Sequence, residues 1–570
     1  SIYKDPKNTI DFNFELAEKI EKDRLNEGAD GAILKNYQGS IHEVNFIEKI
    51  LATILAKLSN FIPGAGIWMN TQRPEWNDAN NALVGNGVSM VTLYYLRRFL
   101  NFFITILKND DSSSFEISTE LYHFFEKLNI SFCKIDSNIS NKDRKKFVDD
   151  IGEVAAEYRD RIYKSYFSGT KELVDVDRLI NFLETAQKLL EKTIDSNKRE
   201  DGLYHAYNLV NLDDNEISID RLSEMLEGQV GVLSSGYLSD SESLSVLDSL
   251  KSSALFWDEQ YSYILYPNKD LLGFLDKNVI PEIEINKSTL LTLLVKNENH
   301  QIIVKDINGK YHFNGLFHNA TCLISELENL PSQYNKLVKE ERESILEIFE
   351  AVFDHKSFTG RSGTFYGYEG LGSIYWHMVS KLLLASAEVT QRSINNKSDP
   401  KITGRLFDHY FEINEGIGVN KSPELYGAFP TDPYSHTPRG RGVQQPGMTG
   451  QVKEDVISRF YELGFYVNDG KIIFEPTVLR KNEFIDEEKS FKFVNLDNEI
   501  TYMDLGKNSL AYTICQVPII YNLSDNESIK IIFHDNSEIN IKNHELDLQN
   551  SQNIFNRTNL IKAVHVRVVK

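Results

Sequence analysis

The hydrophobic residues of this 570-residue chain recur at helical spacing over most of its length. In the stretch 47–58, isoleucines and leucines stand three and four positions apart, which is the spacing of one buried helix face. The polar positions between them carry many Lys and Glu, as solvated helix faces do. This pattern predicts helices over 12–26, 41–59, 88–107, 116–128, 141–167, 175–194, 217–227, 241–252, 332–352, 378–389 and 451–463.

The period changes from helical to alternating after Gly464. Short runs of β-branched and aromatic residues, separated by turns such as Asn468–Asp469–Gly470, are typical of strands. A smaller group of strand-like runs precedes them and includes a hairpin turn expected at Asn308–Gly309. The expected strands lie within 257–266, 301–305, 310–314, 465–467, 471–474, 491–494, 499–504, 510–516, 519–521, 528–534, 537–541 and 562–569. The sequence therefore predicts a mainly α fold with a C-terminal β module, a sandwich packed on the helical body.

Composition narrows the class of protein. The chain is 41% hydrophobic and 11% aromatic, so it can bury a large core. Its formal net charge of −21 argues against nucleic acid as a partner, because neutralising phosphates needs clustered Lys and Arg. Cys133, Cys322 and Cys515 form no metal-binding or disulfide pattern, which favours a reducing compartment. No run suited to a membrane span and no leader stand out, so we expect a cytoplasmic protein without metal or redox cofactor and without a membrane partner.

The first cluster of unusual residues is the acid loop, residues 71–85, which precedes a long apolar helix. A loop at the mouth of a helical scaffold exposes a carboxylic acid such as Asp78 to a substrate. The indole of Trp76 can partly dry that acid and raise its pKa towards neutrality, as general acid catalysis requires. The alternative is that Asp78, Asn80 and Asn81 only cap the next helix.

Two further clusters have the same character. Residues 360–377 combine five glycines with Arg361, Glu369 and His377 directly before a helix. Glycines let the backbone approach a ligand, and a helix start favours an anion. Residues 426–450 gather four prolines with histidine, arginine, glutamine and threonine, and long loops of this kind are usually functional. The alternatives are a surface salt bridge for the arginines and a structural hydrogen bond for the histidine.

Tyr204 and His205 form a fourth, smaller cluster in a polar setting. Aromatic faces beside hydrogen-bonding groups suit sugar rings, whose faces are apolar and whose rims are polar. The alternative, held equal, is a packed tyrosine cluster with a satisfied histidine.

Together the first three clusters resemble a known family. The segment EWNDANN at 75–81 is similar to the loop that holds the general acid in inverting glycoside phosphorylases of family 94, the cellobiose and chitobiose phosphorylase group. The family's acid, the Asp of its Trp–Asn–Asp triplet, falls on Asp78. EGLGSIYWH at 369–377 looks like the family's segment ending in a phosphate-binding histidine, which falls on His377. PGMTG at 446–450 resembles its phosphate loop, although Gln451 replaces an apolar or aromatic residue.

The resemblance covers roughly 60–110 and 360–480, and it implies an (α/α)6 barrel-like helical toroid plus a β-sandwich. We expect four segments: 1–110, with the acid loop and the first part of the barrel; 111–330, a helical insertion or additional barrel helices with a small hairpin; 331–463, the remaining barrel helices and the two later loops; and 464–570, the β-sandwich. The helical stretch of roughly 110–330 has no obvious counterpart. Either the barrel uses helices from it, or the chain is the C-terminal part of a longer protein.

The mechanism follows from the chemistry of glycosidic bonds. Asp78 gives a proton to the leaving oxygen, and a nucleophile attacks from the opposite side of the sugar. If inorganic phosphate attacks, as a co-substrate, no protein base is needed. The resemblance and the loop compositions then assign phosphate to His377, His436, Arg439, Arg441, Thr449 and Gly450. The residues expected to bind the oligosaccharide are Arg73, Glu75, Trp76, Asn77, Asn81, Tyr204, His205, Arg361, Tyr366, Tyr368, Trp376, Gln444 and Gln445.

Two other functions stay open. If water attacks, a second carboxylate must stand about 6.5–9.5 Å from the acid, and Glu369 is the candidate base of such an inverting hydrolase. The other alternative is a carbohydrate-binding scaffold without catalysis. The phosphorylase is preferred because the third cluster is rich in cationic and hydroxyl groups. The sequence also leaves room for a homodimer.

Overall fold

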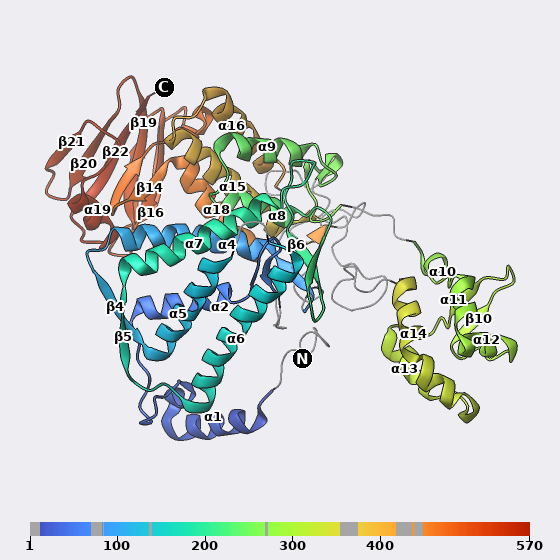
Figure 1. Cartoon of the computed structure of the whole chain (residues 1–570). Helices are drawn as coiled ribbons and strands as arrows, with labels where there is room; N and C mark the ends of the chain where they lie inside the picture. Colours follow the sequence, from blue (N-terminus) through green and yellow to red (C-terminus); the bar gives the residue numbers. More distant parts are fainter. Residues whose placement is uncertain are drawn as a thin grey trace. The chain divides into compact units, whose positions relative to one another are not determined.

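The computed structural model describes residues 12–69, 83, 85–135, 139–267, 272–353, 374–417, 436–437 and 448–569 (Figure 1). The chain forms two compact units. The first comprises residues 1–375 with 436–442, and the second comprises 376–435 with 443–570. The fold is mainly helical with a β module near the C-terminus, as predicted. The helical toroid stays a prediction.

Most helices of the first unit bury apolar side chains along one side. Side-chain oxygens cap several of their N-termini, with Asn45 accepting from Glu48 N, Ser140 from Asp143 N and Asp175 from Arg178 N. The helices are α1 (Phe14–Glu27), α2 (Phe46–Leu58), α4 (Met90–Lys108), α5 (Thr119–Lys134), α6 (Asn141–Ser165), α7 (Val176–Asp195), α8 (Leu226–Ser234) and α9 (Asp240–Lys251). The patterns that predicted most of these helices are confirmed.

A five-stranded antiparallel sheet lies within these helices, and the sequence did not predict it. Its order is β1-β2-β3-β6-β7. The strands are β1 (Phe61–Ile62), β2 (Gly66–Trp68), β3 (Gly87–Ser89), β6 (Tyr207–Leu212) and β7 (Ile217–Arg221). The helix predicted over 217–227 is wrong, because residues 217–221 pair with β6 and helix α8 begins only at Leu226. A separate pair joins β4 (Ser114–Ser118) to β5 (Lys171–Asp175).

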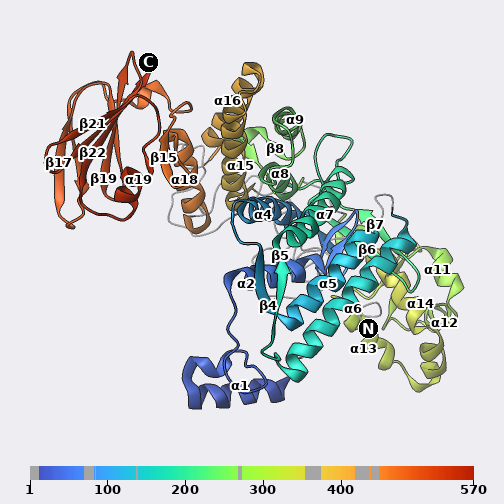
Figure 2. The ribbon, with the colours of Figure 1, turned by 60° about the vertical axis from the view of Figure 1, so that its left-hand side comes forward.

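Helix α4 is central to the first unit. It packs against α7 and α8, and Figures 1 and 2 both show α4 and α8 side by side. Within the described part of the chain it is the one helix long and apolar enough to cross a membrane, and half of its apolar window is buried. Arg97 donates to the Ser235 carbonyl at 3.1 Å and pairs with Glu191 at 2.8 Å. These contacts are those of a core helix.

Residues 272–353 build a core of their own within the first unit. Phe313, Phe349 and Phe353 pack edge to face or tilted with ring centroids 4.9–6.2 Å apart. The predicted turn is present, with Gly309 at φ +82° between β10 and β11. The elements are α10 (Phe274–Lys277), α11 (Glu282–Lys287), α12 (Thr289–Lys296), β10 (Ile303–Lys305), β11 (Tyr311–Phe313), α13 (Ala320–Glu328) and α14 (Asn335–Phe353).

The second unit combines three long helices with the β module. Its sheet has the order β18-β19-β22-β20-β21, in which β19 and β22 are parallel. Two separate two-stranded hairpins, β14-β15 and β16-β17, belong to the same module. The predicted turn between β14 and β15 holds Asp469 at φ 47° and Gly470 at φ 76°. The helices are α15 (Trp376–Asn395), α16 (Pro400–Glu415), α18 (Met448–Leu463) and α19 (Leu548–Phe555). The strands are β14 (Phe465–Asn468), β15 (Lys471–Phe474), β16 (Lys489–Val494), β17 (Ile500–Leu505), β18 (Ser509–Ile514), β19 (Val517–Ser524), β20 (Ser528–Phe533), β21 (Glu538–Ile541) and β22 (Ile561–Val569).

Candidate active site

The acid loop is the connection of a β-hairpin. Strands β2 and β3 pair in antiparallel register, with Trp68 opposite Val88. Beyond that pair, Met69 N donates to Gly87 O at 2.9 Å and Gly85 N donates to Met69 O at 2.7 Å. The Trp68 indole Nε1–H donates to Gly85 O at 2.8 Å. These hydrogen bonds hold the two ends of the connection next to each other. Residues 70–82 and 84 lie outside the described residues.

Two glycines make this closure sterically allowed. Gly85 has φ +94°, which a residue with a side chain rarely adopts. A Cβ added to Gly87 would lie 2.4 Å from Leu83 Cβ. Ser89 then caps α4 by accepting from Thr92 N at 3.0 Å. Ser89 therefore fills the N-cap position of α4, while Asp78, Asn80 and Asn81, the alternative helix caps, lie outside the described residues.

The backbone of residues 204–206 covers the start of α4. Met90 N and Val91 N both donate to Ala206 O, at 2.9 and 3.3 Å. The Tyr94 hydroxyl donates to His205 O at 2.9 Å. Since β6 follows directly and pairs with β3, the Tyr204–His205 cluster is built onto the strand that leaves the acid loop.

The first turn of α8 packs on the same segment. Gly228 comes so close that an added Cβ would lie 2.7 Å from Tyr204 O. The Gln229 amide binds Tyr204 on both sides, accepting from its N–H at 2.9 Å and donating to its carbonyl at 2.8 Å. Leu226 N donates to Leu265 O at 3.0 Å. The first turn of α8 therefore contacts the Tyr204 segment on one side and Leu265, just after β9, on the other.

That segment leads to the other two clusters. Strand β9 (Ser262–Tyr263) pairs with β8 (Phe256–Trp257) and also contacts β12 (Ile374–Tyr375). Strand β12 pairs in turn with β13 (His436–Thr437), so that Tyr375 stands opposite His436. The end of the second cluster and the middle of the third are therefore held together by backbone pairing.

Tyr204 and His205 are both buried, with exposed fractions of 3% and 8%. The His205 ring contacts Leu222 O through Nδ1 at 2.9 Å. Burial, with Arg221 and Arg199 nearby, lowers the pKa of His205 to about 4, so its imidazole is neutral at pH 7. Burial also raises the pKa of Tyr204 to about 12. These contacts favour the structural alternative for the pair, and contact with a sugar stays a prediction.

The remaining predicted residues fall into three groups. Trp376 and His377 occupy the first turn of α15 and are buried, the indole completely. Thr449 and Gly450 lie in the first turn of α18, which begins at Met448 rather than at the predicted Gln451. The others lie outside the described residues: Arg73, Glu75, Trp76, Asn77, Asp78, Asn81, Arg361, Tyr366, Tyr368, Glu369, Arg439, Arg441, Gln444 and Gln445.

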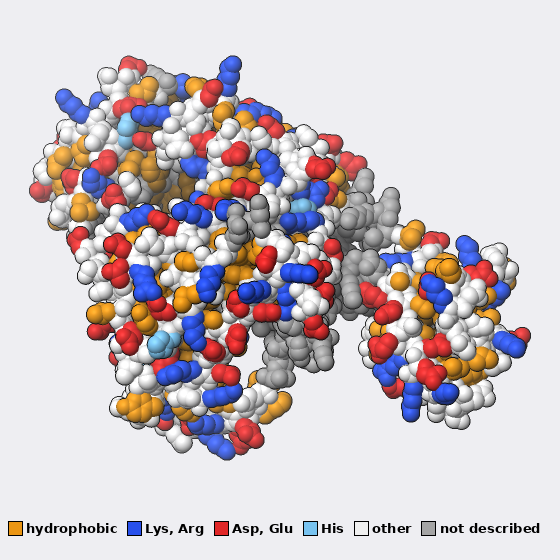
Figure 3. Space-filling view, viewed as in Figure 1, with side chains coloured by type: hydrophobic (Ala, Val, Ile, Leu, Met, Phe, Trp, Pro, Cys, Tyr) orange, Lys and Arg blue, Asp and Glu red, His pale blue; other side chains and the backbone are white. Residues whose placement is uncertain are grey.

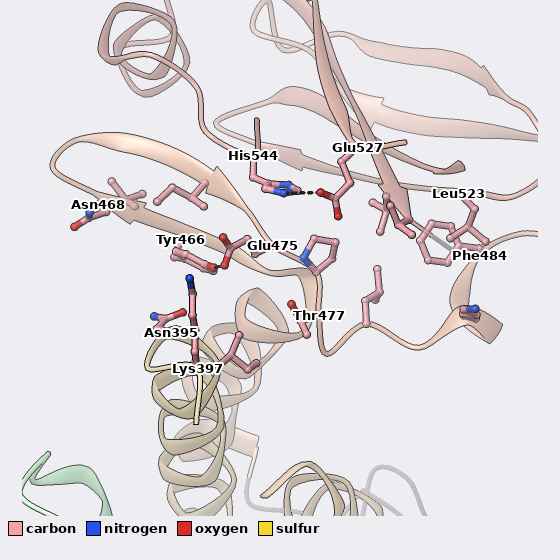
Figure 4. A pocket seen from close by; sticks show the side chains of 18 residues that line it. Asn395, Lys397, Tyr466, Asn468, Glu475, Thr477, Phe484, Leu523, Glu527 and His544 are labelled. Atoms are coloured by element: carbon pink, nitrogen blue, oxygen red, sulfur yellow. Dashed lines mark hydrogen bonds and ion pairs between the residues drawn. The ribbon is translucent and has the colours of Figure 1, made fainter. Parts of the chain in front are cut away.

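A separate cavity of about 950 Å³ lies in the second unit, between the end of α15 and the β module (Figure 4). It contains two carboxylates. The Tyr466 hydroxyl donates to Glu475, and His544 Nε2 lies 2.8 Å from Glu527. Both carboxylates are thus engaged by neighbours, and no residue predicted for catalysis lines this cavity.

One comparison with known proteins identifies part of the chain. Residues 271–356 match the family model described as GH149 phosphorylase insertion domain 2. No curated protein matches the chain. The matched residues are those that build the separate core around Phe349, and they include part of the stretch for which the sequence offered no counterpart. The match does not single out family 94, but it supports an enzyme, a glycoside phosphorylase.

Proposed function

We propose that this enzyme cleaves a glycosidic bond of a β-glucoside or oligosaccharide by inverting phosphorolysis, with Asp78 as general acid. The observation that carries the proposal is the phosphorylase insertion domain at 271–356. The acid-loop sequence EWNDANN, in a different part of the chain, resembles that of another group of glycoside phosphorylases, so both features favour the same reaction.

The closed base of the acid loop supports the role of Asp78. A general acid must be held within hydrogen-bonding distance of the leaving oxygen, and a small displacement costs much of the rate. The hydrogen bonds between Met69, Gly85 and Gly87 fix both ends of the loop on a sheet. In this proposal Trp76 keeps the acid partly dry, which holds its proton until the glycosidic oxygen receives it.

Inorganic phosphate is the proposed nucleophile and the only co-substrate. It attacks the anomeric carbon from the face opposite Asp78, so a β-glucoside gives the α-anomer of the sugar 1-phosphate. The proposal assigns the phosphate to the cationic and hydroxyl residues of the two later clusters, including His377, His436 and Thr449. The backbone pairing of Tyr375 with His436 supports it, because it joins these two clusters.

The proposed architecture is an (α/α)6 toroid, as in family 94, that carries the acid loop at its rim. The surface charge supports a neutral substrate over a nucleic acid, since acidic and basic side chains are interspersed on the face seen in Figure 3. A cytoplasmic location and a homodimer belong to the same proposal.

Synthesis in the reverse direction tests the reaction. The protein is incubated with α-glucose 1-phosphate and a panel of gluco-oligosaccharide acceptors, and released phosphate is measured. Phosphate release that depends on the acceptor is expected. Hydrolysis of an oligosaccharide without phosphate would instead support the hydrolase with Glu369 as base, and inactivity in both assays would favour the binding scaffold.

A further inference from the structure

The cavity of about 950 Å³ between the end of α15 and the β module serves no step of the proposed reaction. All of its lining residues belong to the described part of the second unit. Figure 4 shows labelled side chains around it: Lys397 just beyond α15, Tyr466 and Glu475 from the β14-β15 side, and His544 with Glu527. Its volume suits a small organic ligand, since ligand sites in proteins measure about 300–1,000 Å³.

The two carboxylates of the cavity are each engaged through one oxygen. The Tyr466 hydroxyl donates to Glu475 Oε2, and His544 Nε2 lies 2.8 Å from Glu527 Oε2. Among the described residues, Oε1 of either glutamate has no hydrogen-bond partner. Both carboxylates can therefore accept a hydrogen bond from a ligand that carries hydroxyl groups.

The two lysines of the cavity are not engaged in this way. Lys397 and Lys481 both line it, and neither side chain makes an ion pair or a hydrogen bond within the part of the chain that the structure describes. Because the carboxylates of the cavity contact Tyr466 and His544 instead, the two ammonium groups are left to pair with an anion from solution. This part of the lining therefore favours a negatively charged group.

A third part of the lining is apolar. It includes the rings of Tyr466 and Phe484 together with Leu479, Leu523 and Val568. Inorganic phosphate would leave this surface without a partner, whereas a sugar ring has an apolar face that packs on aromatic side chains. The complementary ligand thus combines an anionic group, hydroxyl groups and a ring with an apolar face.

We propose that this cavity binds a phosphorylated sugar, with Lys397 and Lys481 on the phosphate group and Glu475 and Glu527 on hydroxyl groups of the ring. Lysine binds phosphate as a point charge, and sugar hydroxyls donate to ionised carboxylates. The inference goes beyond the proposed reaction, because no residue of the cavity is assigned to the acid, to the oligosaccharide or to the phosphate co-substrate.

Calorimetric titration with glucose 6-phosphate tests the site. Wild type is compared with Lys397→Gln, with Lys481→Gln and with the variant that carries both changes, and wild type is also titrated with inorganic phosphate, glucose and AMP. Lys492→Gln is the matched control, because Lys492 is an exposed lysine of β16 in the same module and does not line the cavity. Circular dichroism melting checks that each variant is folded.

Wild type is expected to bind glucose 6-phosphate more tightly than inorganic phosphate, glucose or AMP. Each single lysine variant should lose about 5- to 20-fold in affinity, as loss of one charged contact does, and Lys492→Gln should bind as wild type does. The affinity of wild type should also fall as salt is added, since both lysines are exposed.

Equal affinity of wild type and the double lysine variant for glucose 6-phosphate would overturn the inference. Equally tight binding of inorganic phosphate, glucose or AMP to wild type would overturn it as well, because the site would then not select a phosphorylated sugar.

The two proposals fail separately. Acceptor-dependent phosphate release is measured without glucose 6-phosphate, so a wild type that binds this probe through the lysines but releases no phosphate contradicts only the proposed reaction. A wild type that releases phosphate but binds the probe no better than the double lysine variant contradicts only the cavity site.

Discussion

Tyr375 and His436 stand opposite each other in a two-stranded antiparallel pair, although they belong to different clusters of the sequence. Tyr375 lies at the end of the second cluster, directly before Trp376 and His377, and His436 belongs to the third cluster. The pairing therefore holds a residue of the third cluster next to the end of the second. Together with the hairpin base at Met69 and Gly85, it gives two of the predicted loops a defined backbone frame.

Removing the proposed acid should abolish catalysis in both directions. Asp78→Asn keeps the shape of the side chain but cannot supply a proton, so kcat should fall by at least about 100-fold for synthesis and phosphorolysis. Asp160→Asn is the control, because Asp160 makes an exposed ion pair with Lys164 within one helix. Equal activity of Asp78→Asn and Asp160→Asn would remove Asp78 from the acid role.

Adding a methyl group at Gly228 should disturb the site more than the fold. The new Cβ would lie 2.7 Å from Tyr204 O and 3.0 Å from Ala206 N, both backbone atoms, so the first turn of α8 must shift. Gly228→Ala is expected to cost about 1–3 kcal/mol of unfolding free energy and to lower kcat/KM.

Gly152→Ala is the matched control for this change. Gly152 lies inside α6, and an added Cβ would meet no atom within 4 Å. This variant should gain about 0.5–1 kcal/mol in urea denaturation, with unchanged kinetics. A Gly228→Ala variant as stable and active as Gly152→Ala would contradict the close packing.

His205 should make the protein less stable in mild acid. Burial lowers its pKa from 6.5 to about 4, so between these values the unfolded chain binds a proton that the folded chain does not. The stability contribution is complete above pH 6.5 and is lost as the pH falls towards 4, by up to about 3 kcal/mol. Urea denaturation of wild type and His205→Asn across this range measures it.

The slope for wild type includes other groups, because burial also lowers the pKa of His42 and His565. The difference between the two proteins isolates His205. A parallel pair of curves for wild type and His205→Asn would show that His205 titrates normally.

The insertion at 272–353 should respond to core mutations on its own. Phe349 is 1% exposed and packs against Phe313 and Phe353, within a cluster drawn only from this segment. Phe349→Ala should destabilise the segment by about 3–5 kcal/mol and raise its amide hydrogen exchange, while exchange in α4 and α7 stays unchanged.

Phe102→Ala is the control for that experiment, because Phe102 lies on α4 with 59% of its surface exposed. It should leave exchange in the insertion as in wild type. Increased exchange of α4 and α7 in Phe349→Ala would show that the insertion shares its core with the helical body.

The long helices and the β module could be predicted because their hydrophobic periods extend over many residues. Strands β1, β2 and β3 could not, since each has only two or three residues and pairs with partners distant in sequence. The error over 217–227 has the same origin. Its apolar residues fit a helical spacing by coincidence, and the pairing of Ile217 and Ile219 with β6 decides the structure.

The candidate site shows the same division. The acid loop and the two later clusters were recognisable because their Gly, Pro and Trp content is unusual for a connection. The contact of Gln229 with the backbone of Tyr204 was not, since a lone glutamine in the sequence looks like any solvated one until its burial is known. No signal in the sequence alone separates the two cases.

The most direct test of the central claim is ³¹P NMR of wild type with a β-linked gluco-oligosaccharide and inorganic phosphate. We predict that the phosphate signal decreases while the signal of the α-anomer of glucose 1-phosphate grows, and that the oligosaccharide shortens in step. Shortening of the oligosaccharide with the phosphate signal unchanged, or formation of the β-anomer, would contradict inverting phosphorolysis.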